Sequence, residues 1–398
     1  MLPAMRRLLL QFTGFLLILL ASTGGIILTK TATAETTVFQ NGENGYQCFR
    51  IPAIVKAPDG HLLAFAEARK TGCNDFGDID LVMRMSTDNG QTWGPMRVVV
   101  DNGAFLAGNP APVFDLTDRA LAKGRLFLLY NTSTVSENDI RKGLGIREVW
   151  YKTSTDGGQT WSEAVNITTQ VNRPNKPDIN PAYTFSDDWR WYANTPGHAL
   201  QLQKGRYKGR IFVAANHTAG PLQPRFQDGR AHGFYSDDHG KTWKLTPDVA
   251  YPGSNESTAA ETSDGRVLLN SRNQSGDVKN RLLSFSKTAG ERWEPVRVAT
   301  DLPDPVCQGS LIDYQPRRGK RVLLFSNLNH QTSRENLTIR VSTDDGQRWS
   351  GGKTVYSGPS AYSDLVIQQD GQIGILYEKD KYAKIVYQSF SYDWLVKE

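Results

Sequence analysis

The residues in this sequence best suited to chemistry are arginines placed within or beside apolar segments. Arg50 stands in CFRIPAIV, residues 48–55, whose other positions are all apolar. A guanidinium held in a stiff apolar frame either pairs with a nearby acid or forms a fork for a bound carboxylate. Pro52 lacks the N–H that a sheet ladder needs, so we expect this strand at an edge or at an inner rim. These eight residues alone leave both interpretations of Arg50 open.

Three further arginines and two acids stand at the ends of apolar segments. Arg69 follows Glu67 by two positions at the end of LLAFAEAR. Arg272 ends VLLNSR, and Arg334 precedes ENLTIRV. Arginines gathered at a dry centre repel one another unless an anion binds or acids compensate, and Glu67 and Glu378 are suited to that compensation. If the fold gathers these side chains, the ligand that they imply carries a carboxylate.

The elements that must position these residues are indicated by internal repeats. A glycine followed by an apolar run occurs six times, at Gly60, Gly124, Gly209, Gly265, Gly319 and Gly371. The residue seven positions later is polar in every copy: Glu67, Asn131, Asn216, Arg272, Ser326 and Glu378. Either these strands simply end in polar residues at the surface, or their ends surround one central cleft.

A second repeat follows each of the first five runs and has the form S-x-D-x-G-x-x-W in four of its five copies, with Thr288 at the aspartate position of the fourth. Its copies occupy residues 86–93, 154–161, 236–243, 286–293 and 342–349. The aspartate is suited to hydrogen-bond the backbone of its own turn, the glycine to a positive φ, and the tryptophan to packing beneath the turn. A calcium loop is the alternative, but the ligand spacing and the terminal glutamate of such a loop are absent. The repeat therefore predicts hairpin turns.

Strand-like segments separated by turns and repeated six times, without long helical periodicity, predict an all-β fold. The expected architecture is a six-bladed β-propeller of four-stranded antiparallel blades. A ring of this kind brings equivalent strand ends to one axis, which is how distant arginines would meet. We expect residues 35–398 to form this one domain.

Residues 1–34 are predicted to be a secretory signal peptide. Arg6 and Arg7 precede an apolar run from Leu8 to about Leu28, and a small-x-small site lies at residues 32–34. An uncleaved membrane anchor is the alternative, because the run is long enough to span a bilayer. With cleavage, no membrane span remains, and the protein is expected to be secreted or periplasmic.

Charge and cysteine content bound the partners and the redox state. The formal charge of +5 falls to +2 without the three basic residues of the leader, which is no footprint for nucleic acid. Export permits disulfides, and Cys48 and Cys73 flank one expected hairpin, so a bond between them and free thiols both stay open.

Several of these segments together resemble the bacterial exo-α-sialidases, or neuraminidases. They are CFRIP, NDFGDIDLV, NEST, SRNQ, SRENL, AYSDL and the four well-formed copies of the second repeat, called Asp boxes. The resemblance covers residues 38–398. Asp boxes occur in other propellers, whereas FRIP with a downstream tyrosine and three arginines is specific to this family. The resemblance implies hydrolysis of terminal α-linked sialic acids, with no metal or organic cofactor.

The resemblance also implies roles for the charged residues. Arg50, Arg272 and Arg334 would bind the carboxylate of sialic acid, each charge-assisted contact being worth roughly 1.5–3 kcal/mol. Glu378 would orient Arg50, and Arg69, paired with Glu67, would reach the substrate.

The implied nucleophile is Tyr362 in PSAYSDL, with Glu256 of SNEST as its general base. Sialidases are the known tyrosine exception among glycosidases, so this assignment belongs to the family. The carbon under attack bears a carboxylate, which would repel an anionic nucleophile, whereas a phenol stays neutral until it loses its proton. Nearby arginines are expected to favour the phenolate. The reaction would retain configuration through a covalent tyrosyl intermediate.

The implied general acid and base is Asp75 in NDFGD, whose loop would have to raise its pKa. Some relatives place the acid one residue earlier, which here is Asn74 and supplies no acid. Taken singly, Asp75 is a turn aspartate, Tyr362 a packed tyrosine and Glu256 a surface acid; their joint occurrence favours catalysis. His217 either lines the pocket for the sugar's side chain or is structural.

The expected partners are sialylated glycoproteins, glycolipids and oligosaccharides, bound by a monomer. Two other functions compete with hydrolysis. A transglycosidase would pass sialic acid from the same site to another sugar. A catalytically silent propeller would only bind sialic acid or protein, and would be favoured if the tyrosine, glutamate or aspartate were missing.

Overall fold

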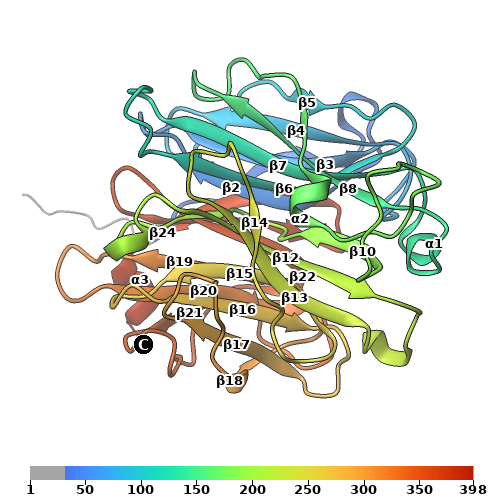
Figure 1. Cartoon of the computed structure of the whole chain (residues 1–398). Coiled ribbons are helices and arrows are strands. Elements are labelled where there is room, and N and C mark those ends of the chain that lie inside the picture. Colours follow the sequence, from blue (N-terminus) through green and yellow to red (C-terminus); the bar gives the residue numbers. More distant parts are fainter. Residues whose placement is uncertain (1–31, 398) are drawn as a thin grey trace, which may run out of the picture.

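The computed structural model describes residues 32–397, in which strands dominate and every helix is short (Figure 1). The helices are α1 (Glu137–Arg141), α2 (Thr168–Val171) and α3 (Tyr392–Val396), with 3-10 turns at Glu43–Gly45, Gly205–Tyr207 and Pro224–Phe226. No helix of the described part is long and apolar enough to cross a membrane. The predicted leader lies outside the described residues except for its last three. The all-β expectation is confirmed.

The first sheet contains eight strands in two antiparallel groups of four. The first group is β2 (Cys48–Lys56), β3 (Leu62–Arg69), β4 (Ile79–Ser86) and β5 (Arg97–Val100). The second is β6 (Leu106–Asp115), β7 (Arg125–Ser133), β8 (Arg147–Ser154) and β9 (Val165–Asn166). A single parallel pair, Ile79 with Leu106, joins the groups. β2 is an edge strand of this sheet, as Pro52 predicts.

Two smaller sheets follow, and a seven-stranded sheet ends the chain. The third group is β10 (Trp189–Asn194), β11 (Leu200–Gln201), β12 (Ile211–Ala219), β13 (Gly229–Ser236) and β14 (Lys244–Leu245). The fourth is β15 (Ser254–Glu261), β16 (Val267–Asn273), β17 (Asn280–Ser286) and β18 (Arg297–Pro303). The last sheet is β19 (Ser310–Tyr314), β20 (Val322–Leu328), β21 (Glu335–Ser342), β22 (Lys353–Ile367), β23 (Ile373–Lys379), β24 (Lys384–Phe390) and β1 (Thr36–Gln40).

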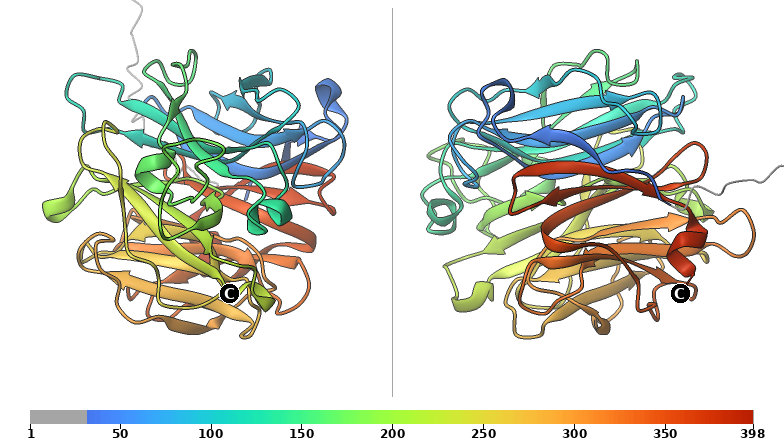
Figure 2. Two further views of the ribbon diagram at one scale, coloured as in Figure 1. Left: turned by 45° about the vertical axis from the view of Figure 1, so that its right-hand side comes forward. Right: turned by 180° about the vertical axis from the view of Figure 1, so that it is seen from behind.

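The two ends of the described chain meet in the last sheet. β1 pairs with β24, and β2 lies beside β22, so the blue and red strands are adjacent (Figure 2). The long strand β22 pairs with β21 through its first half and with β23 through its second. Hydrogen bonds therefore join the strands into four sheets, because β22 and the β4–β6 contact each link two neighbouring groups.

Apolar side chains fill the space between each group of strands and the next. The last sheet divides at β22 into a fifth group, β19–β21 with the first half of β22, and a sixth, the second half of β22 with β23, β24 and β1. Among the described residues six buried clusters occur, and each draws mainly on two neighbouring groups. The cluster between the fifth and sixth groups also includes Ile51 of β2. One of them joins the first group to the last, with Phe49 and Leu62 packed near Leu376 and Tyr387. The core is therefore divided among the interfaces between groups.

The Asp-box segments form the predicted turns. In the first copy Asp88 Oδ1 accepts hydrogen bonds from Ser86 Oγ at 2.8 Å and from Thr92 N at 2.9 Å, and Gly90 has φ 81°. Trp93 packs edge-on against Tyr387 of β24. Copies at Asp156, Asp238 and Asp344 repeat the same aspartate contacts. These segments are structural staples.

Candidate active site

One cavity of about 300 Å³ collects most of the predicted site residues. Eight of the nine line it: Arg50, Glu67, Arg69, Asp75, Glu256, Arg272, Arg334 and Tyr362. The ninth, Glu378, lies buried directly behind Arg50. The three arginines from distant parts of the chain therefore converge, as the central-cleft interpretation requires.

Interruptions in five strands aim residues into this cavity. The ladders of β2, β6, β10, β15 and β22 each skip residues at the cavity. The skipped residues include Ile51, Asn109, Trp191, Glu256 and Tyr362, all of which line the cavity. A bulge turns a side chain away from the ordinary alternation of a strand, and bulges are common beside active sites. Ile51 even takes φ 58°, which is unusual for a β-branched residue.

Arg50 is fixed by a buried carboxylate. Its Nε and Nη2 donate to the two oxygens of Glu378 at 3.1 and 3.3 Å, and its Nη1 donates to Asp75 at 3.1 Å. Burial lowers the pKa of Arg50, but Glu378, with smaller contributions from Tyr362, Asp75 and Tyr382, more than offsets this, so the pKa lies above its usual value. Both interpretations that the sequence left open for Arg50 apply, because it pairs with an acid and also faces the cavity.

Tyr362 lies between an acid and two arginines. Its hydroxyl donates to Glu256 Oε1 at 2.5 Å and accepts from Arg272 Nη1 at 3.1 Å. Arg272 also donates to Glu256 Oε2 at 2.6 Å. The guanidinium of Arg334 lies 5.9 Å from the centre of the Tyr362 ring. The Tyr362 phenol, the Glu256 carboxylate that accepts its hydrogen bond and the Arg272 guanidinium are thus in direct contact.

Burial decides the ionisation of this phenol. Burial raises the pKa of Tyr362, and the charge of Glu256 raises it further. Arg272 and Arg334 lower the pKa, but by a smaller amount. The two arginines favour the phenolate, as expected, but desolvation penalises the anion more than the cations stabilise it, so the net shift of the pKa is upward. Tyr362 is a neutral hydrogen-bond donor here.

Asp75 lies at the mouth of the cavity on a loop pinned to strand β2. The Cys48–Cys73 disulfide, which the sequence left open, is present, with 5.2 Å between Cα atoms. Arg69 Nη1 donates to Asp75 Oδ1 at 2.8 Å and to Cys73 O at 2.6 Å. The Asp75 side chain is 77% exposed.

The pKa of Asp75 lies below its ordinary value in the described state. Desolvation would raise the pKa, but the charges of Arg69 and Arg50 and the hydrogen bond from Arg69 together lower it more. The loop therefore does not by itself supply the raised pKa that a general acid needs, because the same guanidiniums that face the cavity also bind this carboxylate. Glu67 supports the arrangement, since it accepts from Arg69 Nη2 at 2.6 Å and from Asn109 N at 2.8 Å.

Other cavity residues escaped the sequence reasoning. Arg147 is buried, donates to Asn109 Oδ1 at 2.7 Å and stacks 4.2 Å from the Trp191 ring, and burial lowers its pKa to about 10. Glu137, on α1, also lines the cavity, and burial raises its pKa. Outside the lining, Tyr382 covers Arg50, with 4.3 Å from the guanidinium to the ring centre. None of these residues stands seven positions after a repeat glycine. Asn216 does stand at such a position, and it lines the cavity.

His217 does not line this cavity. Strand β12 is regular here, so Asn216 faces the cavity and the next side chain faces away. Its ring stacks on Trp189 with 3.5 Å between ring centres. The suggestion that His217 touches the ligand of the cavity is wrong, because it lies on the other face of the sheet.

Comparisons with known proteins agree with these features. Residues 52–375 match the family model of the BNR repeat-like domain. The chain is 36% identical to a sialidase of Micromonospora viridifaciens over 91% of this chain and 54% of that protein. It is 30% identical to an exo-α-sialidase of Aspergillus fumigatus, over 88% of this chain and 86% of that protein. The chain thus spans about half the length of the first relative and most of the second.

Solved structures give the same picture. The structure named Hadza microbial sialidase Hz136 matches with a TM-score of 0.76 and 26% identity, over 91% of this chain and 69% of that one. An intramolecular trans-sialidase of Ruminococcus gnavus matches with a TM-score of 0.72 over 92% of this chain and 98% of that one. At 17% identity, the second likeness shows the fold alone.

Proposed function

This chain belongs to the sialidase family of BNR repeat-like proteins, and on that premise we propose that it hydrolyses terminal α-linked sialic acids of glycoconjugates. The observation that carries the proposal is the convergence of three guanidiniums and a tyrosine–glutamate pair in one cavity. Its substrates are sialylated glycoproteins, glycolipids and oligosaccharides. Residues 35–398 form the catalytic domain.

The architecture that we propose is a ring of six blades. The strands follow one another in six antiparallel groups, and β1 completes the last group by pairing with β24. The six apolar clusters link consecutive groups, and the cluster between the first and the last supports closure of the ring. The site residues then lie where the inner strands of several blades approach the axis.

Arg50, Arg272 and Arg334 bind the substrate carboxylate. A neutral sugar gains nothing from three guanidiniums, whereas a sialic acid gains several charge-assisted hydrogen bonds. Arg50 is oriented for this by Glu378. Arg69, held by Glu67, reaches the substrate beside Asp75.

The first chemical step forms a covalent intermediate. Tyr362 Oη attacks the anomeric carbon while Glu256 takes the phenolic proton across the short contact between them. The bond from the anomeric carbon to the glycosidic oxygen breaks, and Asp75 gives its proton to that oxygen. In the second step water attacks the same carbon, Asp75 takes a proton from it, and the phenolate leaves and recovers its proton from Glu256. Two inversions give net retention.

Substrate binding supplies the protonated form of Asp75. In the described state its carboxylate occupies Arg50 Nη1 and Arg69 Nη1. The incoming substrate carboxylate competes for Arg50, which weakens that contact and adds a negative charge nearby. Both changes raise the pKa of Asp75 toward the range in which it acts as an acid.

The test is an assay with the mature protein on a fluorogenic sialoside and on sialyllactose. We expect Asp75→Ala to lower kcat/KM on sialyllactose by about 10²–10⁴, as for loss of a general acid, and less on the fluorogenic compound, whose leaving group needs no proton. Tyr362→Phe should abolish the covalent adduct that intact-mass spectrometry detects with a fluorinated sialic acid. Tyr392→Phe, outside the cavity, should behave as wild type.

Two outcomes would overturn the assignment. Absence of sialic acid release by the wild-type protein from every linkage offered would remove the enzymatic proposal and favour a silent binding protein. Full activity of Asp75→Ala on sialyllactose would remove the acid. Transfer of sialic acid to added lactose, measured in the same reactions, distinguishes hydrolysis from transglycosylation.

Export of the mature chain is also a proposal. The predicted cut before Glu35 would remove Thr33, which hydrogen-bonds Ser389 in the described structure. Glu35 itself remains tied to Lys379 at 2.6 Å. N-terminal sequencing of the secreted or periplasmic protein should begin at Glu35, and a cell-bound protein with an intact leader would favour the anchor.

A further inference from the structure

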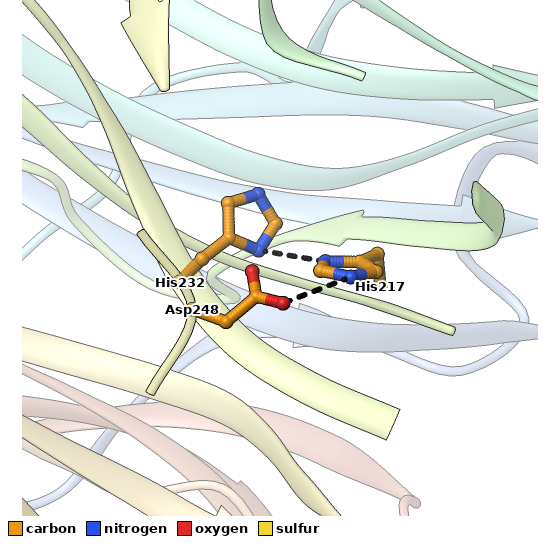
Figure 3. Close-up of side chains that lie close together, drawn as sticks. All are labelled: His217, His232 and Asp248. Carbon is orange, nitrogen blue, oxygen red and sulfur yellow. Dashed lines mark hydrogen bonds and ion pairs between the residues drawn. The ribbon is translucent and has the colours of Figure 1, made fainter. Parts of the chain in front are cut away.

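A second cluster of reactive side chains lies on the face of blade three that turns away from the sialic acid site. His217 comes from β12, His232 from β13, and Asp248 from the segment after β14, and Figure 3 shows the three facing one another. The two imidazoles are 1% and 0% exposed. The Asp248 side chain is 40% exposed and, with His217, lines a surface cavity.

The hydrogen bonding of the two imidazoles is incomplete. Both rings are buried, and a neutral imidazole carries one N–H and one lone pair. The Nδ1 atoms are 3.2 Å apart, so one ring donates to the other. The Nε2 atoms of both rings are buried without a hydrogen-bond partner. One buried Nε2 lone pair therefore has no donor in either tautomer, and such a group is costly.

The distances suit a metal ion better than a hydrogen bond. His217 Nε2 lies 3.6 Å from Asp248 Oδ2, which is too long for an N–H···O bond. Two ligands that are each about 2.1 Å from a tetrahedral zinc lie about 3.4 Å apart. The ligand atoms of all three residues lie within 4.8 Å of one another, so a turn of the His232 ring closes the set. Stacking on Trp189 holds the His217 ring in place.

Two carboxylates lie on the exposed side of the cluster. Asp248 lines the surface cavity together with Asp187, and the guanidinium of Arg230 lines the same cavity. A divalent ion would neutralise the two carboxylates, and the exposed edge of the cavity leaves room for water as a further ligand.

We propose that His217, His232 and Asp248 form a binding site for a divalent transition-metal ion, for which zinc is the best match to two imidazoles and a carboxylate. The site is structural, because none of its residues lines the catalytic cavity. It ties β12 and β13 to the segment after β14, and its neighbours on β10 and β12, Trp191 and Asn216, line that cavity.

The test is zinc binding by the untagged protein after treatment with a chelator. We expect one zinc per chain by isothermal titration and elemental analysis, a higher Tm with zinc, and visible d–d absorption when cobalt replaces zinc. Asp248→Asn, a partly exposed change that keeps the side chain's shape, should weaken zinc binding at least about tenfold, the lower bound seen even for outer-shell groups. His217→Asn should abolish the cobalt spectrum.

The control is His61→Asn, which removes another histidine close to an aspartate. His61 Nδ1 lies 3.5 Å from Asp59, without a third ligand in the group, and the change should leave zinc binding unaltered. Circular dichroism in the presence of chelator shows whether each variant is folded. Wild-type protein that binds no zinc, or Asp248→Asn and His217→Asn proteins that bind it as tightly as wild type, would overturn the proposal and leave a metal-free histidine pair packed on Trp189.

Discussion

One buried carboxylate sets the positions of two residues that we assign to substrate binding and chemistry. Glu378 accepts from Arg50 Nε and Nη2, from the backbone N–H of Ile51 at 2.9 Å, and from the backbone N–H of Tyr362 at 3.1 Å. It has no exposed surface. The side chain thus links the bulge of β2 to the bulge of β22, and its charge balances a buried guanidinium.

Replacement of Glu378 by glutamine tests this link. The amide keeps the shape but loses the charge, and its NH₂ group faces the N–H groups of Arg50. Breaking a buried ion pair costs about 3–5 kcal/mol, so we expect a decrease of that order in the free energy of unfolding, measured with denaturant. KM for sialyllactose should rise because Arg50 loses its orientation. Glu163→Gln, on an exposed loop, is the control; a Glu378→Gln protein as stable as that control contradicts the proposed role.

At the scale of single elements, the Asp-box turns act as spacers between neighbouring blades. Gly90 approaches the blade beside it so closely that a Cβ atom there would lie 2.1 Å from the Tyr387 ring. The glycine is required both by its φ of 81° and by this contact. The staple therefore shapes its own turn and also fixes the distance to the next blade.

Two alanine substitutions at glycines with the same φ separate these effects. Gly371 has φ 82° but open space around it, so Gly371→Ala pays only the backbone strain, about 1–2 kcal/mol. Gly90→Ala adds a steric clash in a packed interface, which costs roughly 1–3 kcal/mol more. Denaturant unfolding of both variants gives the difference. Equal losses of stability would show that the contact with Tyr387 does not matter.

The sequence predicts strands and turns well and the shape of the site less well. Repeated glycines and Asp boxes report local backbone preferences, which act within a few residues. Arg50, Tyr362 and Glu256 were predicted because they lie in motifs of a known family. Trp191 was missed because a bulge in β10, which depends on the pairing with a distant strand, aims it at the cavity. The lowered pKa of Asp75 could not be predicted for a similar reason, since it depends on arginines that the fold brings together.

At the scale of the whole molecule, one polar side chain joins several blades at the centre. Asp364 of β22 accepts from Ile54 N at 2.8 Å, from His198 N at 3.0 Å and from Ser310 Oγ at 2.7 Å. His198 Nδ1 lies 2.7 Å from Asp364 Oδ1, the oxygen that also accepts from Ser310. Ile54 lies on β2, His198 between β10 and β11, and Ser310 on β19, so the carboxylate ties together parts of the chain that the apolar clusters connect only pairwise.

The pair of His198 and Asp364 makes the stability of the fold depend on pH. Burial lowers the pKa of His198, but the charge and hydrogen bond of Asp364 raise it more, so the folded pKa lies above the unfolded value of about 6.5. The folded state then holds the proton more tightly, and the stabilisation is fully present below pH of about 6.5 and is lost as pH rises through the folded pKa. We expect the difference in unfolding free energy between wild type and His198→Gln to shrink as the pH of the denaturant titration is raised, since glutamine at this position does not titrate. If the difference in unfolding free energy stays constant or grows with pH, His198 is neutral in the folded protein. Asp364 then has no cationic partner there.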